Sequence, residues 1–241
     1  KTFKNTPFLV FINHNSSLTG APIYLYDLII NLQSKLNYNL ILLDVIPNIE
    51  VIDYYNKMDN IFFYYNDTKC LLNILTILNP ILIYSNSCNS FLSNISLFSR
   101  FLNKTILHFH EYYNNICNQK QYLPYLQKVN SIFNVTLSLC STYKKHLNRD
   151  IICHSPYLSK TKMLEIDTLS REDISLLNLN NKNITLAMIG TRNKRKGYDI
   201  FIHVAKLYPT INFIWIGGKY DESIDLTNVY QIEHTKNPYK Y

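Results

Sequence analysis

Glycine is scarce in this sequence, with only five glycines among 241 residues, at positions 20, 190, 197, 217 and 218. Each one lies at or just beyond the end of a strand-like apolar run, or at the start of the helical pattern that follows. Glycine is favoured where the backbone turns sharply or comes close to a ligand. In an open α/β sheet, ligands bind at the carboxyl ends of the strands. The placement of the glycines therefore predicts a two-part α/β protein that binds a ligand.

Cysteine and long apolar runs are also limited. The five cysteines are odd in number and widely spaced, without a C-x-x-C pair. This pattern argues against a disulfide framework or a structural zinc site, and we expect a reducing compartment and a cytoplasmic location. No apolar stretch reaches the roughly 18 residues that span a bilayer. The first residues run directly into a strand pattern and do not resemble a signal peptide.

Charged residues make up only 17% of the chain, whereas apolar residues make up 47%, so a large core is available and global disorder is excluded. The formal net charge is +7, and the basic residues are dispersed except in the run from Arg192 to Lys196. Basic stripes with interleaved aromatic residues are missing from the sequence, so we expect no nucleic-acid partner. The positive charge suits an anionic ligand or a membrane surface.

Short apolar runs alternate with helical patterns, which is typical of βαβ units around a parallel sheet. The expected strands are Phe8–Asn13, Asn39–Val45, Ile61–Tyr65, Ile81–Tyr84, Lys104–Phe109, Val135–Leu139, Ile151–Cys153, Ile184–Ile189, Ile211–Ile216 and Val229–Ile232. The expected helices are Pro22–Leu36, Cys70–Leu78, Phe91–Leu102, Ser141–Leu147, Ser170–Leu177 and Tyr198–Leu207. We expect a doubly wound, Rossmann-like domain over residues 1–155, a connection over 156–182 and part of a second such domain over 183–241.

The run from Gly190 to Gly197 carries the clearest chemistry. A strand leads into a loop with a basic cluster, and Gly197 opens the next helix. Exposed N–H groups and the positive end of the helix dipole favour an anion there. Arg195 and Lys196 add full charges, so a diphosphate is the expected ligand. The alternative is a solvated basic loop without a ligand.

Several segments of the sequence resemble motifs of one known enzyme family. In the second half, MIGTRNKRKGYDIFIHVAKL (188–207) with the strand FIWIGG (213–218) is similar to the start of that family's nucleotide-sugar-binding domain, and HTKNPYKY (234–241) to the stretch before its donor-sugar loop. In the first half, the similar segments are FINHNSSLTGAPIYLYDLIINL (11–32), IYSNSCNSFL (83–92), ILHFHEYY (106–113), SLCSTYKKHL (138–147) and ICHSPYLSK (152–160). These segments occur in the family's order and cover nearly the whole chain, so the sequence resembles the GT-B glycosyltransferases of the family 4 (glycosyl transferases group 1) type.

This resemblance implies a retaining, metal-independent transfer of a sugar from a UDP- or GDP-linked donor, without a cofactor, to a glycan, lipid or protein acceptor. Peripheral membrane contact is compatible with such an enzyme. Gly20 and Ala21 would face the donor phosphates, and Arg195 and Lys196 would hold the diphosphate. The other residues expected to bind the donor diphosphate are Gly190, Thr191 and Arg192.

His110 and Glu111 are the expected catalytic residues, because HFHEYY is in register with the family's strand-end motif. A structural histidine at a strand end, and a glutamate that caps the next segment, are the alternatives. Alternation along the strand places His108 on the same face as His110 but deeper, towards the core. For His14 a surface loop position is the expected reading.

The sequence departs from the family pattern at two places. Thr191 stands where the family has its diphosphate arginine, so Arg192 would act from a shifted position. The family's two donor-binding glutamates, separated by seven residues, have no counterpart after Gly218, because Glu222 and Glu233 come too early. A non-catalytic, transferase-like binding module therefore stays open as an alternative. A Rossmann dehydrogenase is disfavoured, since NHNSSLTGAP replaces G-x-G-x-x-G after the first strand.

Overall fold

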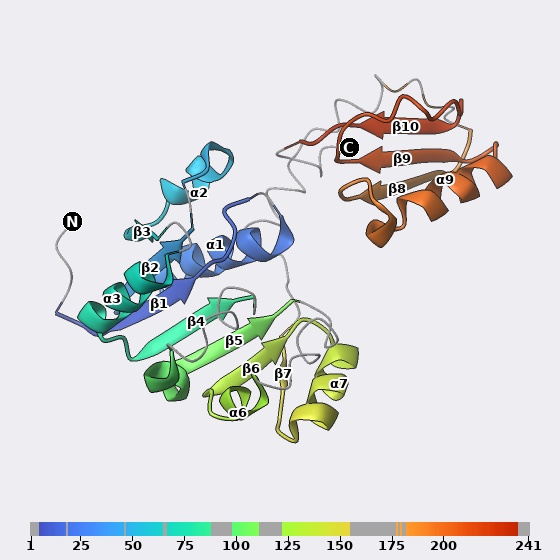
Figure 1. Ribbon diagram of the computed structural model, residues 1–241. Helices are drawn as coiled ribbons and strands as arrows, with labels where there is room; N and C mark the ends of the chain where they lie inside the picture. Colours follow the sequence, from blue (N-terminus) through green and yellow to red (C-terminus); the bar gives the residue numbers. More distant parts are fainter. Residues whose placement is uncertain are drawn as a thin grey trace. The chain divides into compact units, whose positions relative to one another are not determined.

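The computed structural model describes residues 5–17, 19–45, 47–64, 67–87, 98–110, 122–154, 177, 179 and 182–235. The chain divides into two compact units, residues 1–157 and residues 158–241, and each is described by itself. Both units are drawn in Figure 1.

The first unit is built on a seven-stranded sheet in which all registered strand pairs are parallel, with the order β3-β2-β1-β4-β5-β6-β7. Its strands are β1 (Phe8–Ile12), β2 (Asn39–Asp44), β3 (Ile61–Phe63), β4 (Leu82–Asn86), β5 (Thr105–Phe109), β6 (Ser131–Asn134) and β7 (Ile152–Cys153). Its helices are α1 (Gly20–Gln33), η1 (Ile49–Val51), α2 (Ile52–Tyr55), α3 (Thr68–Leu78), η2 (Ser99–Lys104), α6 (Leu123–Leu126) and α7 (Leu137–Leu147). This sheet confirms the predicted doubly wound α/β architecture.

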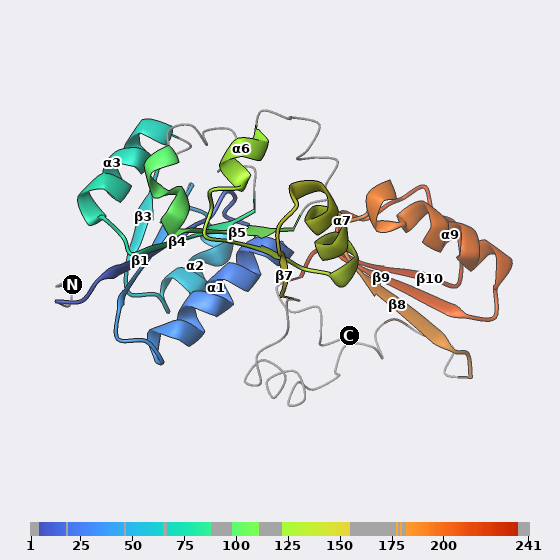
Figure 2. The same ribbon diagram turned by 90° about the horizontal axis from the view of Figure 1, so that it is seen from below.

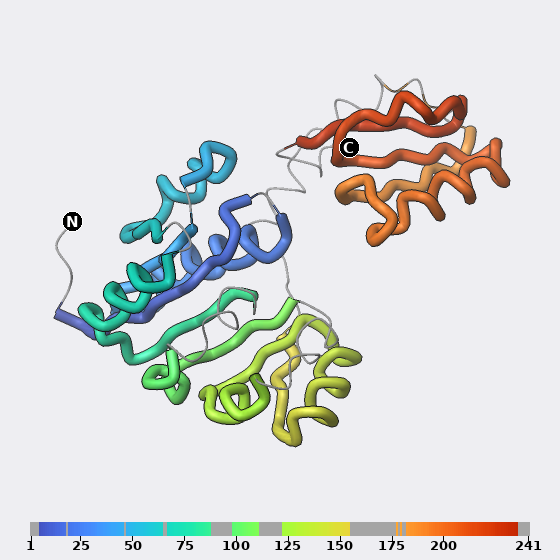
Figure 3. The backbone as a smooth tube through the Cα atoms, viewed as in Figure 1, coloured from blue at the N-terminus to red at the C-terminus, as the bar shows by residue number. Residues whose placement is uncertain are grey.

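Helices cover both faces of this sheet, as the view in Figure 2 shows. On one face, α3, α6 and α7 pack on the alternate strand residues that include Ile41, Leu107 and Ile132. On the other face, α1 and α2 pack on residues such as Phe11 and Leu42. The central strands are buried on both sides, which explains why β2 reads as a continuous apolar run instead of an alternating one. The trace in Figure 3 follows the alternation of strand and helix through the unit.

The strand order reverses between β1 and β4, which are hydrogen-bonded neighbours although β2 and β3 intervene in the sequence. In doubly wound sheets a ligand binds at such a switch point, outside the carboxyl ends of the strands. The residues that follow β1, β4 and β5 are therefore the first place to look for a site in this unit.

One predicted strand is wrong. Val135–Leu139 is not a strand, because the neighbouring Ser131–Asn134 forms β6 and the chain then turns into α7 at Leu137. The Thr136 hydroxyl accepts from the backbone N–H of Leu139 and caps this helix, which overrides the apolar appearance of the segment. The other predicted strands agree with the structure to within two residues at each end. The predicted helix Ser170–Leu177 lies outside the described residues apart from Leu177, as does most of Phe91–Leu102.

The second unit has a parallel three-stranded sheet with the order β10-β9-β8. Its elements are β8 (Thr185–Ile189), η5 (Lys194–Lys196), α9 (Tyr198–Leu207), β9 (Asn212–Ile216) and β10 (Val229–Ile232). Helix α9 packs Phe201, Ile202 and Ala205 against Phe213 and Trp215 of β9. All five residues of β9 are buried, whereas all five of β8 are exposed. No helix within the described ranges combines the length and apolarity needed to cross a membrane.

Candidate functional site

The carboxyl end of the first unit's sheet is organised around the side chain of Asn86. Nε2 of His110, the residue after β5, lies 2.9 Å from Oδ1 of Asn86. Nδ2 of Asn86 donates to the carbonyl oxygen of Ala21 at 2.8 Å, and Nδ1 of His14 lies 3.3 Å from the Asn86 carbonyl oxygen. Because Nδ2 is the donor to Ala21, Oδ1 is an acceptor, so the network assigns the proton to Nε2 of His110. In the neutral ring, Nδ1 is then the nitrogen that can take a proton.

His108 lies beneath His110 and is fully buried, as the alternation along β5 predicts. The two imidazole centroids are 4.4 Å apart. Nδ1 of His108 is 2.5 Å from the Tyr84 hydroxyl. Burial, followed by the nearby charges of His110 and His154, lowers the pKa of His108 to about 3. His108 therefore stays neutral and serves as a fixed platform below His110.

Tyr24 of α1 ties the helix to this group of histidines. Its hydroxyl is 3.0 Å from Nδ1 of His154, and its ring meets those of His108, His110 and His154 edge-on at centroid distances of 5.2, 6.1 and 5.9 Å. His154, the residue after β7, stacks on Phe133 at 5.9 Å. Three strand ends and one helix thus hold the His110 ring in a defined position, which is what a catalytic side chain requires.

A buried carboxylate, Asp44 at the end of β2, supports the loop before α1. It is fully buried and accepts hydrogen bonds from five donors. The donors are Asn13 Nδ2 at 3.2 Å, Ser16 Oγ at 2.7 Å, Tyr26 OH at 2.8 Å, Tyr55 OH at 3.1 Å and the Val45 backbone N–H at 2.8 Å. Burial raises the pKa of Tyr55 to about 12, so its hydroxyl remains a neutral donor. This network fixes the path of residues 13–16 towards α1.

Gly20 and Ala21, expected in the loop before a helix that starts at Pro22, instead form the first turn of α1. A Cβ atom at Gly20 would meet nothing within 4 Å, so this glycine leaves open space at the helix start. Ala21 contributes its carbonyl oxygen to Asn86. Glu111, the second expected catalytic residue, lies outside the described residues.

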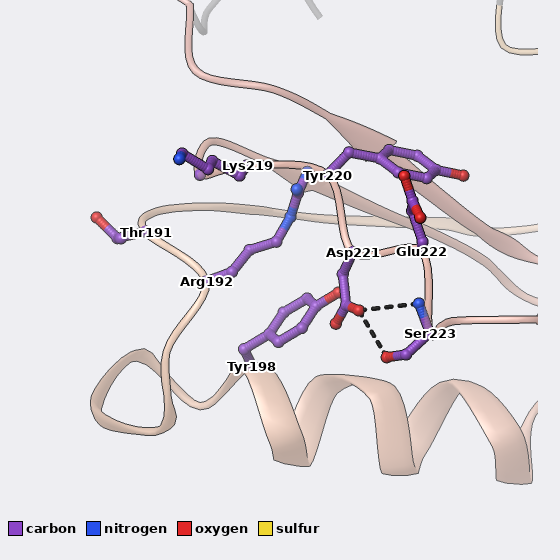
Figure 4. Close-up of a pocket in the computed structure, with 9 residues that line it drawn as sticks. Thr191, Arg192, Tyr198, Lys219, Tyr220, Asp221, Glu222 and Ser223 are labelled. Atoms are coloured by element: carbon purple, nitrogen blue, oxygen red, sulfur yellow. Dashed lines mark hydrogen bonds between the residues drawn. The ribbon is translucent and has the colours of Figure 1, made fainter.

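In the second unit, two hollows open at the carboxyl ends of the strands. The larger has a volume of about 710 Å³ and the smaller about 280 Å³. Both are lined by Thr191 after β8 and by Gly218 and Lys219 after β9. The larger also includes Arg192, Tyr198 and the loop from Tyr220 to Ser223, which Figure 4 shows around the Arg192 side chain. The predicted strand-end loop thus borders a concave surface.

Arg192 is a positively charged residue that lines the larger hollow. Its Nη2 donates to the carbonyl oxygen of Ile232 at 3.0 Å, while its Nε and Nη1 are buried without a hydrogen-bond partner. Leaving charged N–H groups desolvated and unpaired is costly, and an anionic oxygen would satisfy them. Asp221 contributes the nearby negative charge, and its pKa is lowered chiefly by hydrogen bonds from Ser223 and to a smaller extent by Arg192.

The glycines of this unit allow two backbone turns to approach closely. The Gly190 carbonyl oxygen accepts from Nε1 of the buried Trp215 at 2.7 Å. That same oxygen lies 2.9 Å from the position of a Cβ atom on Gly217, whose φ is +111°. A Cβ on Gly218, with φ +80°, would meet the Arg192 backbone nitrogen at 3.0 Å. Only glycine fits both positions, so the scarcity of glycine reflects real close approaches here.

The basic run forms a tight turn before α9. Asn193 caps η5, accepting from the Lys196 backbone N–H at 3.0 Å through Oδ1, and Gly197 adopts φ +78° before the helix. Arg195 and Lys196 are exposed. The Lys196 side chain crosses Gly190, since its Cγ and Cδ lie 3.8 Å from a Cβ built there. The turn therefore brings Lys196 to the end of β8, beside Thr191, while Arg195 is exposed on the same short helix.

Several residues were missed by sequence reasoning. Asn86 and Tyr24 contact His110, and His154 contacts Tyr24 and His108. Lys219 lines both hollows of the second unit. The polar run at the end of β4 is a signal that could have identified Asn86. Among the described residues, no group of three or more histidine, cysteine, aspartate or glutamate side chains is arranged to hold a metal ion.

No protein-family model matches the chain, and no curated protein matches its sequence. Solved structures are similar in fold. HepE from Anabaena, in complex with UDP and glucose, has a TM-score of 0.73 at 12% identity over 96% of this chain and 70% of HepE. Sucrose-phosphate synthase from Thermosynechococcus elongatus has a TM-score of 0.66 at 12% identity over 98% of this chain and 72% of its own. UDP-GlcNAc 2-epimerase from Neisseria meningitidis, bound to UDP-GlcNAc, has a TM-score of 0.55 at 14% identity over 95% and 72%.

These likenesses define the fold of the chain as GT-B-like, with a seven-stranded Rossmann-like sheet in the first unit and a three-stranded parallel sheet in the second. The predicted fold class is therefore confirmed. The neighbours include both sugar transferases and an epimerase, so the reaction has to be argued from the residues of the site.

Proposed function

We propose that this chain is a GT-B glycosyltransferase that binds a UDP- or GDP-linked sugar. The observation that carries the proposal is the carboxyl edge of the second sheet, where two buried guanidinium nitrogens of Arg192 lack a hydrogen-bond partner beside glycine turns and Lys196. Oriented cations and backbone N–H groups at a strand–helix junction suit a diphosphate. Several structural neighbours are nucleotide-sugar enzymes, which supports the same ligand class.

The chemistry proposed is transfer with retention of the anomeric configuration, of the family 4 type and without a metal. The nucleoside diphosphate leaves as an anion, so its developing charge has to be stabilised by protein groups. Thr191, Arg192, Arg195 and Lys196 are the proposed ligands of the diphosphate, with the backbone of Gly190. Pre-aimed donors of this kind stabilise charge that develops in the transition state. The acceptor is proposed to be a glycan, a lipid or a protein.

In the first unit, His110 is the proposed catalytic residue and Asn86 its positioning residue. The Asn86 amide fixes which nitrogen of His110 carries a proton, and the rings of His108 and Tyr24 fix the plane of the imidazole. Gly20 and Ala21 are proposed to border the donor phosphates. Glu111 is proposed as a second catalytic residue.

Isothermal titration with UDP and with GDP tests the ligand class. We expect wild-type binding of one nucleotide, weakened about ten- to a hundredfold in Lys196→Ala and in Arg192→Ala, because each removes one charge-assisted contact. Lys206→Ala, an exposed lysine in the last turn of α9, is the matched control for loss of one positive charge and keeps wild-type affinity. Equal binding by all four proteins, or no heat with either nucleotide, would contradict the proposal.

The reaction class is tested by incubating the chain with UDP- and GDP-sugars and a panel of glycan, lipid and protein acceptors, with and without EDTA. We expect acceptor-dependent release of nucleotide that EDTA leaves unchanged, and a product with the anomeric configuration of the donor by NMR. Tight nucleotide binding with no turnover would instead support the non-catalytic binding module. Epimerised sugar without an acceptor product would assign the site to isomerisation.

A further inference from the structure

We propose that Cys140 and Cys153 form a reversible intramolecular disulfide when the chain meets a disulfide oxidant such as oxidised glutathione. The two cysteines belong to different elements, α7 and β7, at the end of the first unit. Both are free thiols in the structure. The proposal concerns the first unit alone and does not rest on nucleotide binding.

The register of the sheet places the two side chains on the same face. Ile132 of β6 packs against Tyr143 and Leu147 of α7, so it points to the face that α7 covers. Asn134 is two residues further along β6 and shares that face. In the β6–β7 ladder Asn134 is the partner of Cys153, and registered partners in parallel strands point to the same side. Cys153 therefore points towards α7.

Cys140 reaches the same place from the helix. It is 7% exposed, and its Sγ lies 4.0 Å from the carbonyl oxygen of Asn134. That oxygen also accepts from the His154 backbone N–H at 2.8 Å, so the Cys140 sulfur lies directly over the ladder that carries Cys153. Cys140 also forms a side-chain hydrogen bond with Cys153, so the two thiols face each other between α7 and β7.

The reactivities of the two thiols set the order of the reaction. Burial, followed by a side-chain hydrogen bond to Cys153, raises the pKa of the Cys140 thiol to about 11. The half-buried Cys153 therefore attacks the oxidant first, forming a mixed disulfide and releasing one glutathione thiolate. The Cys140 thiolate then attacks the Cys153 sulfur and expels the second glutathione. The two protein thiols lose two protons and two electrons, and one oxidised glutathione becomes two reduced molecules.

The link would fix the segment that leads out of the first unit. Cys153 is followed by His154, which bonds to Tyr24 and stacks on Phe133 in the His110 surroundings. Joining Cys153 to α7 holds this residue in place. The closed loop contains about 14 residues, for which chain-entropy arguments predict a rise in Tm of roughly 5–10 °C.

The test uses the full chain, reduced and then incubated with oxidised glutathione at pH 7.0 and pH 9.0, alkylated and mapped with trypsin under non-reducing conditions. Cleavage after Lys128, Lys144, Arg149 and Lys160 leaves each cysteine in its own peptide, 129–144 and 150–160. We expect the linked pair of peptides, formed faster at pH 9.0 because the thiolate of Cys140 is rare at neutral pH, and released by dithiothreitol. The melting temperature should rise with the link.

Cys140→Ser and Cys153→Ser should abolish both the linked peptides and the rise in Tm, whereas Cys70→Ser, a free thiol on α3, should keep both. Far-UV circular dichroism shows whether each variant is folded. A folded wild-type chain that yields only a glutathione adduct on Cys153 at pH 9.0 would overturn the proposal. So would linkage of Cys140 or Cys153 to Cys88 or Cys117.

Discussion

The carbonyl oxygen of Gly190 lies 2.9 Å from the point where a Cβ atom on Gly217 would stand. The ends of β8 and β9 are held this close by the hydrogen bond from Trp215 to the same oxygen, at 2.7 Å. The proposed diphosphate site borders this contact. A side chain at Gly217 would therefore separate the two turns that line it.

Alanine substitutions at three glycines distinguish two causes of lost stability: strain from a positive φ, and a clash of the added Cβ atom with neighbouring atoms. Gly217→Ala combines a positive φ with a clash against backbone, and we expect it to destabilise the second unit by about 2–4 kcal/mol. Gly197→Ala has a positive φ but free space, so about 1 kcal/mol is expected. Gly20→Ala has neither and should stay within about 0.5 kcal/mol of wild type. Urea denaturation followed by Trp215 fluorescence reports the first two, and circular dichroism the third; equal losses at Gly197 and Gly217 would refute the role given to the close approach.

Acid should destabilise the first unit through His108. Its pKa of about 3 in the folded chain lies below the ordinary value of 6.5, so below pH 6.5 the unfolded chain binds a proton that the folded chain does not. Stability is complete above that pH and falls as the pH is lowered towards 3, by about 2 kcal/mol at pH 5. We expect His108→Phe to remove about this much of the difference in unfolding free energy between pH 7 and pH 5. A pH dependence in His108→Phe equal to that of wild type would show that His108 is not the titrating group.

The buried carboxylate of Asp44 should be essential for the loop before α1. Asp44→Ala leaves Asn13, Ser16, Tyr26 and Tyr55 without their common acceptor, and a loss of about 3–5 kcal/mol is expected. Glu50→Ala, an exposed acidic residue of η1 in the same unit, should change stability by less than about 0.5 kcal/mol. Urea unfolding followed by circular dichroism measures both, and a cost below about 1 kcal/mol at Asp44 would show that water can replace the carboxylate.

Catalysis should depend on His110 more than nucleotide binding does. We expect His110→Ala to lower kcat by about 100-fold or more while the UDP or GDP affinity stays within about twofold, since the charged side chains proposed to hold the diphosphate belong to the second unit. Asn86→Leu should lower kcat by a smaller factor and shift the pH–rate profile, because Nε2 of His110 loses its acceptor. His203→Ala, on the exposed side of α9, is the control and should be unchanged. Wild-type turnover in His110→Ala would remove it from the mechanism.

The strands were predictable because a strand buried on both faces requires an uninterrupted run of mostly apolar residues, as in β2 and β9. The failure at Val135–Leu139 has a local cause. Thr136 is a helix cap and not a strand residue. Its hydroxyl accepts from the Leu139 backbone N–H, which favours a helix over a strand for the apolar residues that follow.

The candidate site was predictable only where a reactive or charged residue directly follows a strand in the sequence. His110 directly follows β5, and the basic turn follows β8 and Gly190. Tyr24 and His154 contact the same group of rings although they are 130 residues apart in the sequence. No pattern in the sequence predicts that contact. The same holds for Arg192. The sequence shows a cation near the turn, but only the fold shows that Arg192 donates to the Ile232 carbonyl oxygen and that two of its nitrogens lack a partner.

The exposure of strand β8 affects how the protein associates in solution. Within the described ranges it pairs with β9 on one side, and its residues are exposed, Leu186 by 45% and Ile189 by 54%. An apolar strand with an open row of amide and carbonyl groups invites another strand to add beside it. At the high concentrations used for crystallisation or NMR, the preparation should therefore form oligomers seen by light scattering. A lysine at Leu186 would repel such additions and keep the sample monodisperse.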